Sequence, residues 1–172
     1  GLYAAKDVQI KKYDLTIHKQ AQSLEALDVV LISDIHLGYT TGSKSIQKLV
    51  QQINDLDADL ICIAGDLFDN NLSSIDSLDE IIQQFSRLKA TFGVYACLGN
   101  HDVERPVKIK NHIAKDGGKA NNGEQAMDAN AAMLDFYKKA GITLLQDEAV
   151  LVNDAFYVAG RLDAAPNGIP NH

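Results

Sequence analysis

The sequence predicts an α/β fold in which helices flank a central, mostly parallel sheet. Three short apolar runs, at residues 29–32, 60–64 and 94–98, have the length and composition of buried strands. The segments between them place apolar residues three and four positions apart, which is the spacing of one face of a helix. This alternation is the order of βαβ units, whose parallel strands are buried on both faces. Right-handed crossovers then bring the carboxyl ends of all three strands to one edge of the sheet.

Two helices and an early strand complete the first half. Residues 8–17 alternate in character and predict a strand ahead of the first apolar run. The helix after that run can be capped by Ser43 or Ser45. The helix after the second run can be capped by Ser73 or Ser74. The apolar faces expected for these helices are Ile46, Leu49, Val50 and Ile53 in the first, and Ile75, Leu78, Ile81, Ile82, Phe85 and Leu88 in the second.

The second half of the chain begins with a long loop. Residues 103–124 contain Pro, Gly and Lys without an apolar pattern, and a loop of this length is typical of a functional or mobile segment. A helix is predicted over residues 125–140, with Gly141 in the position of a C-terminal cap. Residues 149–152 and 155–158 predict two strands of a hairpin, joined by an Asn-Asp turn.

The composition excludes several classes of protein. Of 172 residues, 46% are apolar and 23% are charged, which excludes a disordered chain and fits one domain. The net charge of −7 argues against a specific nucleic-acid partner, because general affinity for polyanions needs a basic surface. No run approaches the ~18 apolar residues of a membrane span, so we expect the sequence as given to be soluble. Cys62 and Cys97 lie in predicted strands and are expected to be inert core thiols.

Polar side chains that can bind metals follow all three predicted strands. Asp34 and His36 follow the first strand and Asp66 follows the second. Asn100 and His101 follow the third. In open α/β sheets, ligands bind in the crevice beyond the carboxyl ends of the strands. Parallel strands lie ~4.8 Å apart, so these side chains can converge. Any one of them alone would be an ordinary polar cap on a strand or turn, but together they favour a site.

The types of donor atom indicate which ions the site would take. Carboxylate oxygens beside imidazole nitrogens suit Mn, Fe or Zn, whereas Mg and Ca draw mostly oxygen. Carboxylates held close together need a cation between them at neutral pH, and a pair of metal ions is the simplest neutralising partner. Gly65 and Gly99 each precede a candidate ligand at a sharp turn, where a Cβ would obstruct the backbone.

Three blocks of sequence resemble the motifs of one enzyme family. Residues 34–36 (Asp-Ile-His), 65–69 (Gly-Asp-Leu-Phe-Asp) and 99–102 (Gly-Asn-His-Asp) resemble, in order and spacing, the D-x-H, G-D-x-x-D and G-N-H-D/E blocks of the calcineurin-like metallophosphoesterases. The resemblance covers residues 29–102 and extends more loosely to Asp163. It implies that the α/β sheet is part of a two-sheet sandwich of αββα type.

The resemblance also implies a role for each matching position. Two divalent ions (Mn, Fe or Zn) would be the cofactors, and a hydroxide that bridges them would attack phosphorus in line. Asp66 would bridge both ions, and His101 would face the substrate and protonate the leaving oxygen. The implied residues are the metal ligands Asp34, His36, Asp66 and Asn100, the catalytic residue His101, and Asp69 and Asp102, which would orient their neighbours.

The sequence departs from the family pattern in one respect. The family completes its site with a later His and a G-H-x-H block, and the remaining histidines of this chain, His18, His112 and His172, form no such block. We therefore interpret residues 1–172 as a single metallophosphoesterase domain truncated at its C-terminal end. On this interpretation the chain alone is expected to bind metal weakly and to have little or no activity.

Candidate substrate-binding residues lie outside the motifs. The 103–124 loop carries five positive and three negative charges and leaves directly from the His101 turn, so Lys108 and Lys110 can contact an anionic substrate. Arg161 follows the predicted hairpin and can lie at the edge of the site. The alternatives are a solvated loop and an ordinary structural turn.

We therefore predict a hydrolase that cleaves phosphomonoester, phosphodiester or pyrophosphate bonds. The expected substrate is a phosphorylated small molecule, lipid or nucleotide. The competing hypothesis is a binding or scaffold module that kept the fold and lost its metals. The residues ahead of the first motif are similar to those of bacterial members whose catalytic domain follows membrane-spanning segments. This similarity suggests that a longer protein contacts the membrane through segments outside this chain.

Overall fold

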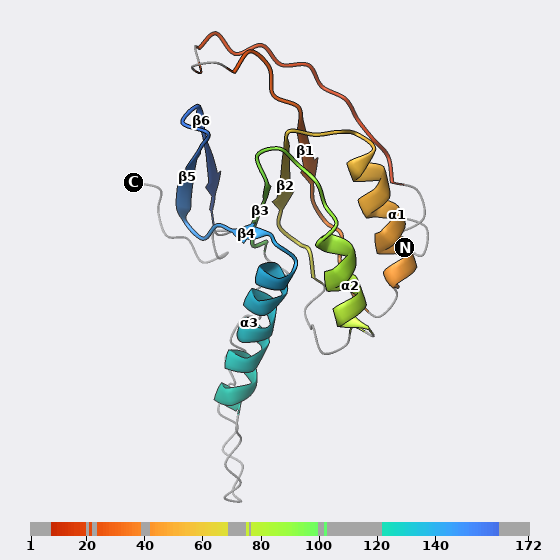
Figure 1. The fold of residues 1–172 in the computed structure, drawn as a ribbon. Helices are drawn as coiled ribbons and strands as arrows, with labels where there is room; N and C mark the ends of the chain where they lie inside the picture. Colours follow the sequence, from red (N-terminus) through yellow and green to blue (C-terminus); the bar gives the residue numbers. More distant parts are fainter. Residues whose placement is uncertain are drawn as a thin grey trace, which may run out of the picture.

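A four-stranded parallel sheet forms the centre of the computed structural model (Figure 1). Its strands lie in the order β1-β2-β3-β4 and are parallel, and the first three confirm the predicted βαβ alternation. The strands are β1 (Val29–Ile32), β2 (Leu60–Ala64), β3 (Val94–Cys97) and β4 (Thr143–Leu144). The structure describes residues 8–19, 21, 24–38, 42–68, 75, 77–99, 102 and 122–161, and side chains in all of these except 122–130.

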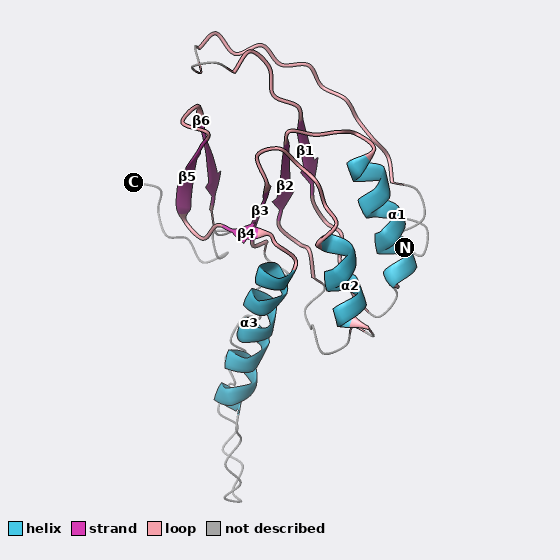
Figure 2. Ribbon diagram, viewed as in Figure 1, coloured by secondary structure: helices cyan, strands magenta, loops and turns pink. Residues whose placement is uncertain are grey.

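Three helices cover one face of this sheet (Figure 2). The buried face carries Ile61 and Ile63 of β2, which are 0% and 1% exposed and belong to one core cluster with residues of all three helices. An amphipathic pattern explains each helix, because its apolar stripe faces this core. The helices are α1 (Ser43–Asn54), α2 (Leu78–Phe85) and α3 (Asn122–Lys139).

The opposite face of the sheet differs from the prediction that the strands are buried on both sides. Leu31 and Cys62 are register partners on this face, and Leu31 is 69% exposed. Among the described residues, the β5–β6 hairpin is the element on this side, and it meets the sheet at β3 (Figure 1). The side chains of β1 therefore stay open to solvent on this face.

The β5–β6 hairpin confirms the predicted strand pair. Strands β5 (Glu148–Val152) and β6 (Phe156–Gly160) are antiparallel. Asn153 and Asp154 both have positive φ, 51° and 52°, as in the type I′ turns that match the twist of paired strands.

The end of α3 confirms the cap predicted at Gly141. This glycine has φ +69°, and its N–H donates to the Lys138 carbonyl over 3.2 Å. The next N–H, of Ile142, donates to the Tyr137 carbonyl over 2.9 Å. This pair of hydrogen bonds is a Schellman motif, which satisfies the last carbonyls of the helix. The helix itself begins three residues before the predicted residue 125.

The predicted strand over residues 8–17 is wrong. The segment is extended but pairs with no strand among the described residues, and Leu15 is 86% exposed. Alternation alone cannot form a strand, because the backbone N–H and C=O groups need a neighbouring strand to bond. The pattern also gave no sign of β4, since two residues are too few to show a period.

The helix starts also differ from the predicted serine caps. The residue before α1 is Gly42, and no side chain caps the helix, although Ser43 or Ser45 was expected to do so. Helix α2 follows Ser77, which lies in the left-handed region with φ 63° and makes no side-chain cap. The other cap candidates, Ser73 and Ser74, lie outside the described residues.

The two cysteines lie on the face of the sheet opposite the helices, which also carries Leu31, and not in the core. Cys62 and Cys97 are half-buried free thiols, which corrects the expectation that they are core residues. Partial burial raises the pKa of both thiols, which lowers the fraction of reactive thiolate at neutral pH.

We expect both thiols to react more slowly in the folded chain than in the unfolded chain. The measurement is the rate of labelling by a chromogenic disulfide reagent at pH 7.5, with and without guanidinium chloride. Equal rates in the two conditions would contradict the expected protection.

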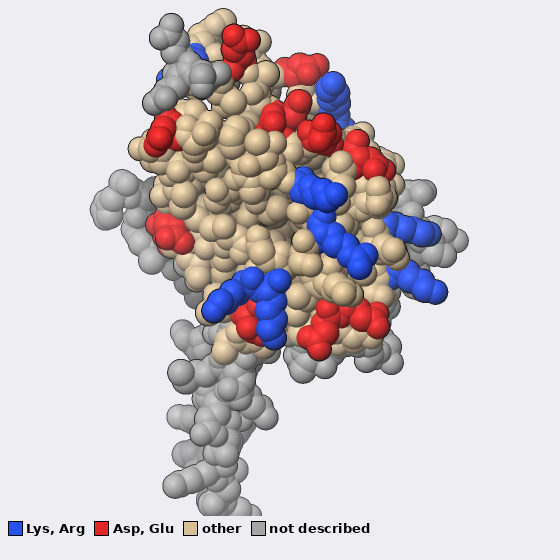
Figure 3. Space-filling view, in the orientation of Figure 1, with Lys and Arg blue, Asp and Glu red and all other residues tan. Residues whose placement is uncertain are grey.

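The surface carries charges of both signs. On the face drawn in Figure 3, acidic and basic side chains are interspersed over the described residues, with no broad basic area. This agrees with the net charge of −7. Each helix in the described part of the chain is too short or too polar to cross a membrane.

Candidate metal centre

The segments that follow β1 and β2 continue side by side beyond the strands. The N–H of His36 donates to the Asp66 carbonyl over 3.0 Å, and the N–H of Leu37 donates to the Leu67 carbonyl over 2.7 Å. An isolated parallel bridge then joins Leu37 to Phe68. The pairing of the strands therefore extends into the turns and places Asp34 and His36 alongside Asp66.

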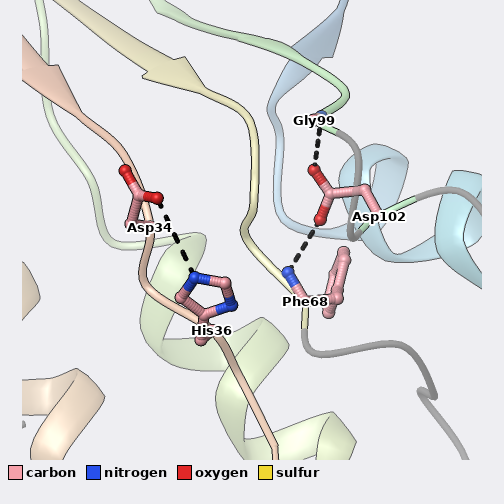
Figure 4. Close-up of polar contacts among 5 residues, drawn as sticks. All are labelled: Asp34, His36, Phe68, Gly99 and Asp102. Atoms are coloured by element: carbon pink, nitrogen blue, oxygen red, sulfur yellow. Dashed lines mark hydrogen bonds and ion pairs between the residues drawn. The ribbon is translucent and has the colours of Figure 1, made fainter. Parts of the chain in front are cut away.

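Asp34, His36 and Asp66 form one group of potential metal ligands. Each offers one ligand atom, and these atoms lie within 4.8 Å of one another. His36 Nε2 is 3.9 Å from Asp34 Oδ1 (Figure 4). The side chains of His36 and Asp34 are 38% and 66% exposed, so an ion can reach them from solvent. Two carboxylates and one imidazole suit a divalent transition metal.

All three residues of this group lie in the left-handed region of backbone conformation. Their φ values are 56° for Asp34, 49° for His36 and 52° for Asp66. Asp and His are among the residues that tolerate this region, but each such position is uncommon outside glycine. Strained backbone of this kind clusters at functional sites, where the surrounding structure maintains it. The three positions occur at two successive strand ends, which supports a functional role for this edge.

Two glycines allow the second and third strand-end turns to touch. Gly65 has φ +80°, and a Cβ built there would lie 2.7 Å from the backbone N and Cα of Gly99. A Cβ built on Gly99 would lie 2.5 Å from the backbone N of Asp66. The expectation that a Cβ would obstruct these turns is confirmed. In each case the Cβ of one turn would collide with the backbone of the other.

Asp102 joins the same two turns through hydrogen bonds. It is 7% exposed; Oδ1 accepts the N–H of Phe68 over 2.8 Å, and Oδ2 accepts the N–H of Gly99 over 2.8 Å (Figure 4). Burial raises the pKa of its carboxyl, and the N–H groups of Gly99, Phe68 and Asp66 oppose that rise. Sequence comparison with the family motifs suggested that Asp102 orients its neighbours; the structure shows that its carboxylate binds backbone groups.

Phe68 is a residue of this region that sequence reasoning did not single out. Its ring is buried beneath the turn and meets Phe136 edge-on at a centroid distance of 4.9 Å and Tyr137 at 6.0 Å. The available signal was an aromatic residue two positions after Asp66, directly beyond a buried strand. Helix α3 thus supports the turn that carries Asp66.

Of the other predicted site residues, the structure describes Asp102 and Arg161. Arg161 directly follows β6 and is exposed. The other candidates, which lie outside the described residues, are Asp69, Asn100, His101, Lys108 and Lys110.

Comparison with known proteins finds a family and several relatives to which this chain is similar. The model of the calcineurin-like phosphoesterase family matches residues 27–162. A transmembrane protein with metallophosphoesterase domain from Danio rerio is 37% identical over 99 residues, which are 58% of this chain and 22% of the relative. An uncharacterized metallophosphoesterase from Aquifex aeolicus is 26% identical over 157 residues, which are 91% of this chain and 50% of that protein.

A third relative has a more specific name. The UDP-2,3-diacylglucosamine pyrophosphatase LpxG of Chlamydia muridarum is 28% identical over 95 residues, which are 55% of this chain and 28% of the relative. The chain thus spans between about a fifth and a half of the length of these relatives. Since the family model covers most of the chain, including all three strand-end turns, the chain belongs to the calcineurin-like phosphoesterase family.

Proposed function

We propose that this chain provides part of the active site of a metal-dependent hydrolase of phosphoester bonds. The observation that carries the proposal is the convergence of Asp34, His36 and Asp66, whose ligand atoms lie within 4.8 Å of one another at the carboxyl edge of the sheet. This edge is where open α/β sheets bind ligands. The family assignment supports the same chemistry.

Each proposed site residue has a distinct part in this proposal. Asp34, His36 and Asp66 would hold a divalent cation, and Asp66 with Asn100 would be the residues to hold a second one. Divalent ions (Mn, Fe or Zn) bound there would supply positive charge for the phosphoryl oxygens and would lower the pKa of bound water. His101, which directly follows Asn100 in the sequence, would deliver a proton to the leaving oxygen. The exposed Asp34 and His36 side chains leave the phosphoryl group a path from solvent.

The substrate is proposed to be a phosphomonoester, phosphodiester or pyrophosphate on a small molecule, lipid or nucleotide. Lys108, Lys110 and Arg161 are the candidates for contact with its anionic groups. The relative named as a UDP-2,3-diacylglucosamine pyrophosphatase supports inclusion of pyrophosphates among the substrates tested. The relative named as a transmembrane protein supports membrane association of the complete protein through segments outside this chain.

The proposal predicts that Asp66→Asn removes Mn²⁺ binding from the chain. The substitution keeps the size of the side chain, and Asn tolerates the left-handed conformation at this position, so the loss is of one anionic ligand. Loss of a residue that only orients a metal ligand lowers metal affinity by ~10–100-fold. We expect Asp66→Asn to lower Mn²⁺ affinity by more than this, because it removes a ligand. The measurements are Mn²⁺ titration of this chain by calorimetry and, in a longer chain that includes a G-H-x-H block, hydrolysis of p-nitrophenyl phosphate and bis-p-nitrophenyl phosphate.

Asp57→Asn is the matched control. Asp57 is also an aspartate in the left-handed region, with φ 50°; unlike Asp66 it is exposed, and it follows α1 and not a strand of the site. It is expected to bind Mn²⁺ like the unsubstituted chain. Equal Mn²⁺ affinity in Asp66→Asn and Asp57→Asn would refute the ligand role of Asp66. Absence of Mn²⁺ binding by the unsubstituted chain would favour the alternative of a non-catalytic binding module.

A further inference from the structure

We propose that Asp102 is a positioning residue that sets the metal affinity of the site by fastening the turn that carries Asp66 to the turn that carries Gly99. The inference rests on the proposed function, because it takes Asp66 to be a metal ligand. It assigns Asp102 a specific target, the backbone of the two turns, and it makes no use of contact between Asp102 and an ion.

The two oxygens of Asp102 bind two different turns. Oδ1 accepts the N–H of Phe68, which lies 34 residues earlier in the chain, and Oδ2 accepts the N–H of Gly99 within its own turn. Both bonds are 2.8 Å long, and Asp102 is 7% exposed. Charge-assisted bonds to backbone N–H groups in a buried setting are about twice as strong as neutral ones. The carboxylate therefore works as a link between the ends of β2 and β3.

This link acts on Asp66 because Asp66 lies inside the linked segment. The turns are already at van der Waals contact, since neither Gly65 nor Gly99 leaves room for a Cβ. The Asp66 carbonyl accepts the His36 N–H on the side of β1, while Asp102 holds the following residues on the side of β3. Without the link, the turn can move away from Gly99 and carry the Asp66 carboxylate with it.

Helix α3 restrains the same turn through the core, by contact with the Phe68 ring. The ring of Phe68 packs edge-on against Phe136 and Tyr137, with centroids 4.9 and 6.0 Å away. The backbone of Phe68 is bound by Asp102, and its ring is bound by the core. Asp66 is thus two residues from Phe68, whose backbone and ring are both restrained.

Asp102→Asn tests the link with minimal change in shape. An Asn side chain has one acceptor oxygen, so one of the two backbone N–H groups would face an NH₂ group and lose its bond. We expect Mn²⁺ affinity, measured by titration, to fall about 10–100-fold, as for other residues that orient metal ligands. In the metal-free chain, we also expect faster hydrogen exchange at the amides of Phe68 and Gly99.

Asp59→Asn is the matched control for this substitution. Asp59 also accepts a backbone N–H, from Asp28 over 2.9 Å, but it lies at the opposite end of β2. The substitution removes the same charge, while the one acceptor oxygen of Asn can keep the bond to the Asp28 N–H. It is expected to leave Mn²⁺ affinity within about twofold, because Asp59 is remote from the ligands.

The outcomes separate this inference from the proposed function. If the unsubstituted chain binds Mn²⁺ through Asp66 and folded Asp102→Asn binds it equally well, the positioning role is wrong and the proposed function stands. If the unsubstituted chain does not bind Mn²⁺, both are wrong. Fast exchange at Phe68 and Gly99 in the unsubstituted chain would also overturn the link, and this measurement does not depend on a variant that folds.

Asp102→Glu provides a second variant if Asp102→Asn does not fold. It keeps both acceptor oxygens on an arm that is one methylene longer, so the link is displaced and not removed. Its Mn²⁺ affinity is expected to be lower than that of the unsubstituted chain, which Asp59→Asn should match. It is expected to be higher than that of Asp66→Asn. Affinity equal to that of the unsubstituted chain would argue against a defined geometric role for Asp102.

Discussion

Replacement of Phe136 with alanine is expected to lower the free energy of unfolding by about 3–5 kcal/mol, the usual cost of deleting a buried aromatic ring. Phe136 lies on α3 and is 0% exposed. Its ring meets Phe68 at 4.9 Å, Phe85 at 5.6 Å and Tyr137 at 5.6 Å, all edge-on. The substitution would open a cavity where α3, α2 and the turn after β2 meet. Denaturant unfolding followed by circular dichroism measures the effect.

Leu134→Ala is the control on the same helix. Leu134 is 47% exposed and lies outside the core cluster, so its loss is expected to change the free energy of unfolding by less than about 0.5 kcal/mol. Both variants shorten an apolar side chain of α3 to alanine. Equal costs at Phe136 and Leu134 would mean that α3 is not packed as the structure shows.

The three central strands were predictable because their signals are local and unambiguous. Residues 29–32, 60–64 and 94–98 are continuous apolar runs that end at polar turn residues, and the periodic segments between them specify crossover helices. The position of Asp34, His36 and Asp66 at one sheet edge follows from this topology, since parallel strands end on the same side.

Other features depend on contacts that no local pattern contains. Residues 8–17 have the alternation of a strand, but a strand also needs a partner, and none lies beside them among the described residues. The prediction that β1 is buried on both faces assumed cover on each side, whereas Leu31 is 69% exposed. The left-handed backbone of His36 was equally hidden, because it results from the pairing of two turns that are remote in sequence.

The other large effect is expected at Gly65, where alanine should destabilise the chain and weaken the metal centre together. The positive φ of +80° costs an L-residue about 1–2 kcal/mol. The new Cβ would also lie 2.7 Å from backbone atoms of Gly99, and overpacking of this kind costs typically ~1–3 kcal/mol. Because the neighbouring atoms belong to backbone, relief requires that the two turns separate.

Gly141→Ala divides this cost into its two parts. Gly141 also has positive φ, +69°, but a Cβ there meets nothing within 4 Å. Its substitution therefore carries the conformational cost without the steric one. Gly65→Ala is expected to be at least 1 kcal/mol more destabilising than Gly141→Ala in denaturant unfolding, which is the lower end of the overpacking cost.

Metal affinity provides the sharper comparison between the two glycine variants. Separation of the turns would move Asp66 away from Asp34 and His36, so Gly65→Ala should weaken Mn²⁺ binding even under conditions where the chain stays folded. Gly141→Ala changes the end of α3 and should leave Mn²⁺ affinity unchanged. If both variants lose stability equally and neither alters Mn²⁺ binding, contact between the strand-end turns does not determine the position of Asp66. If only Gly65→Ala weakens Mn²⁺ binding, the backbone contact between Gly65 and Gly99 determines the position of Asp66 and therefore the metal affinity of the site.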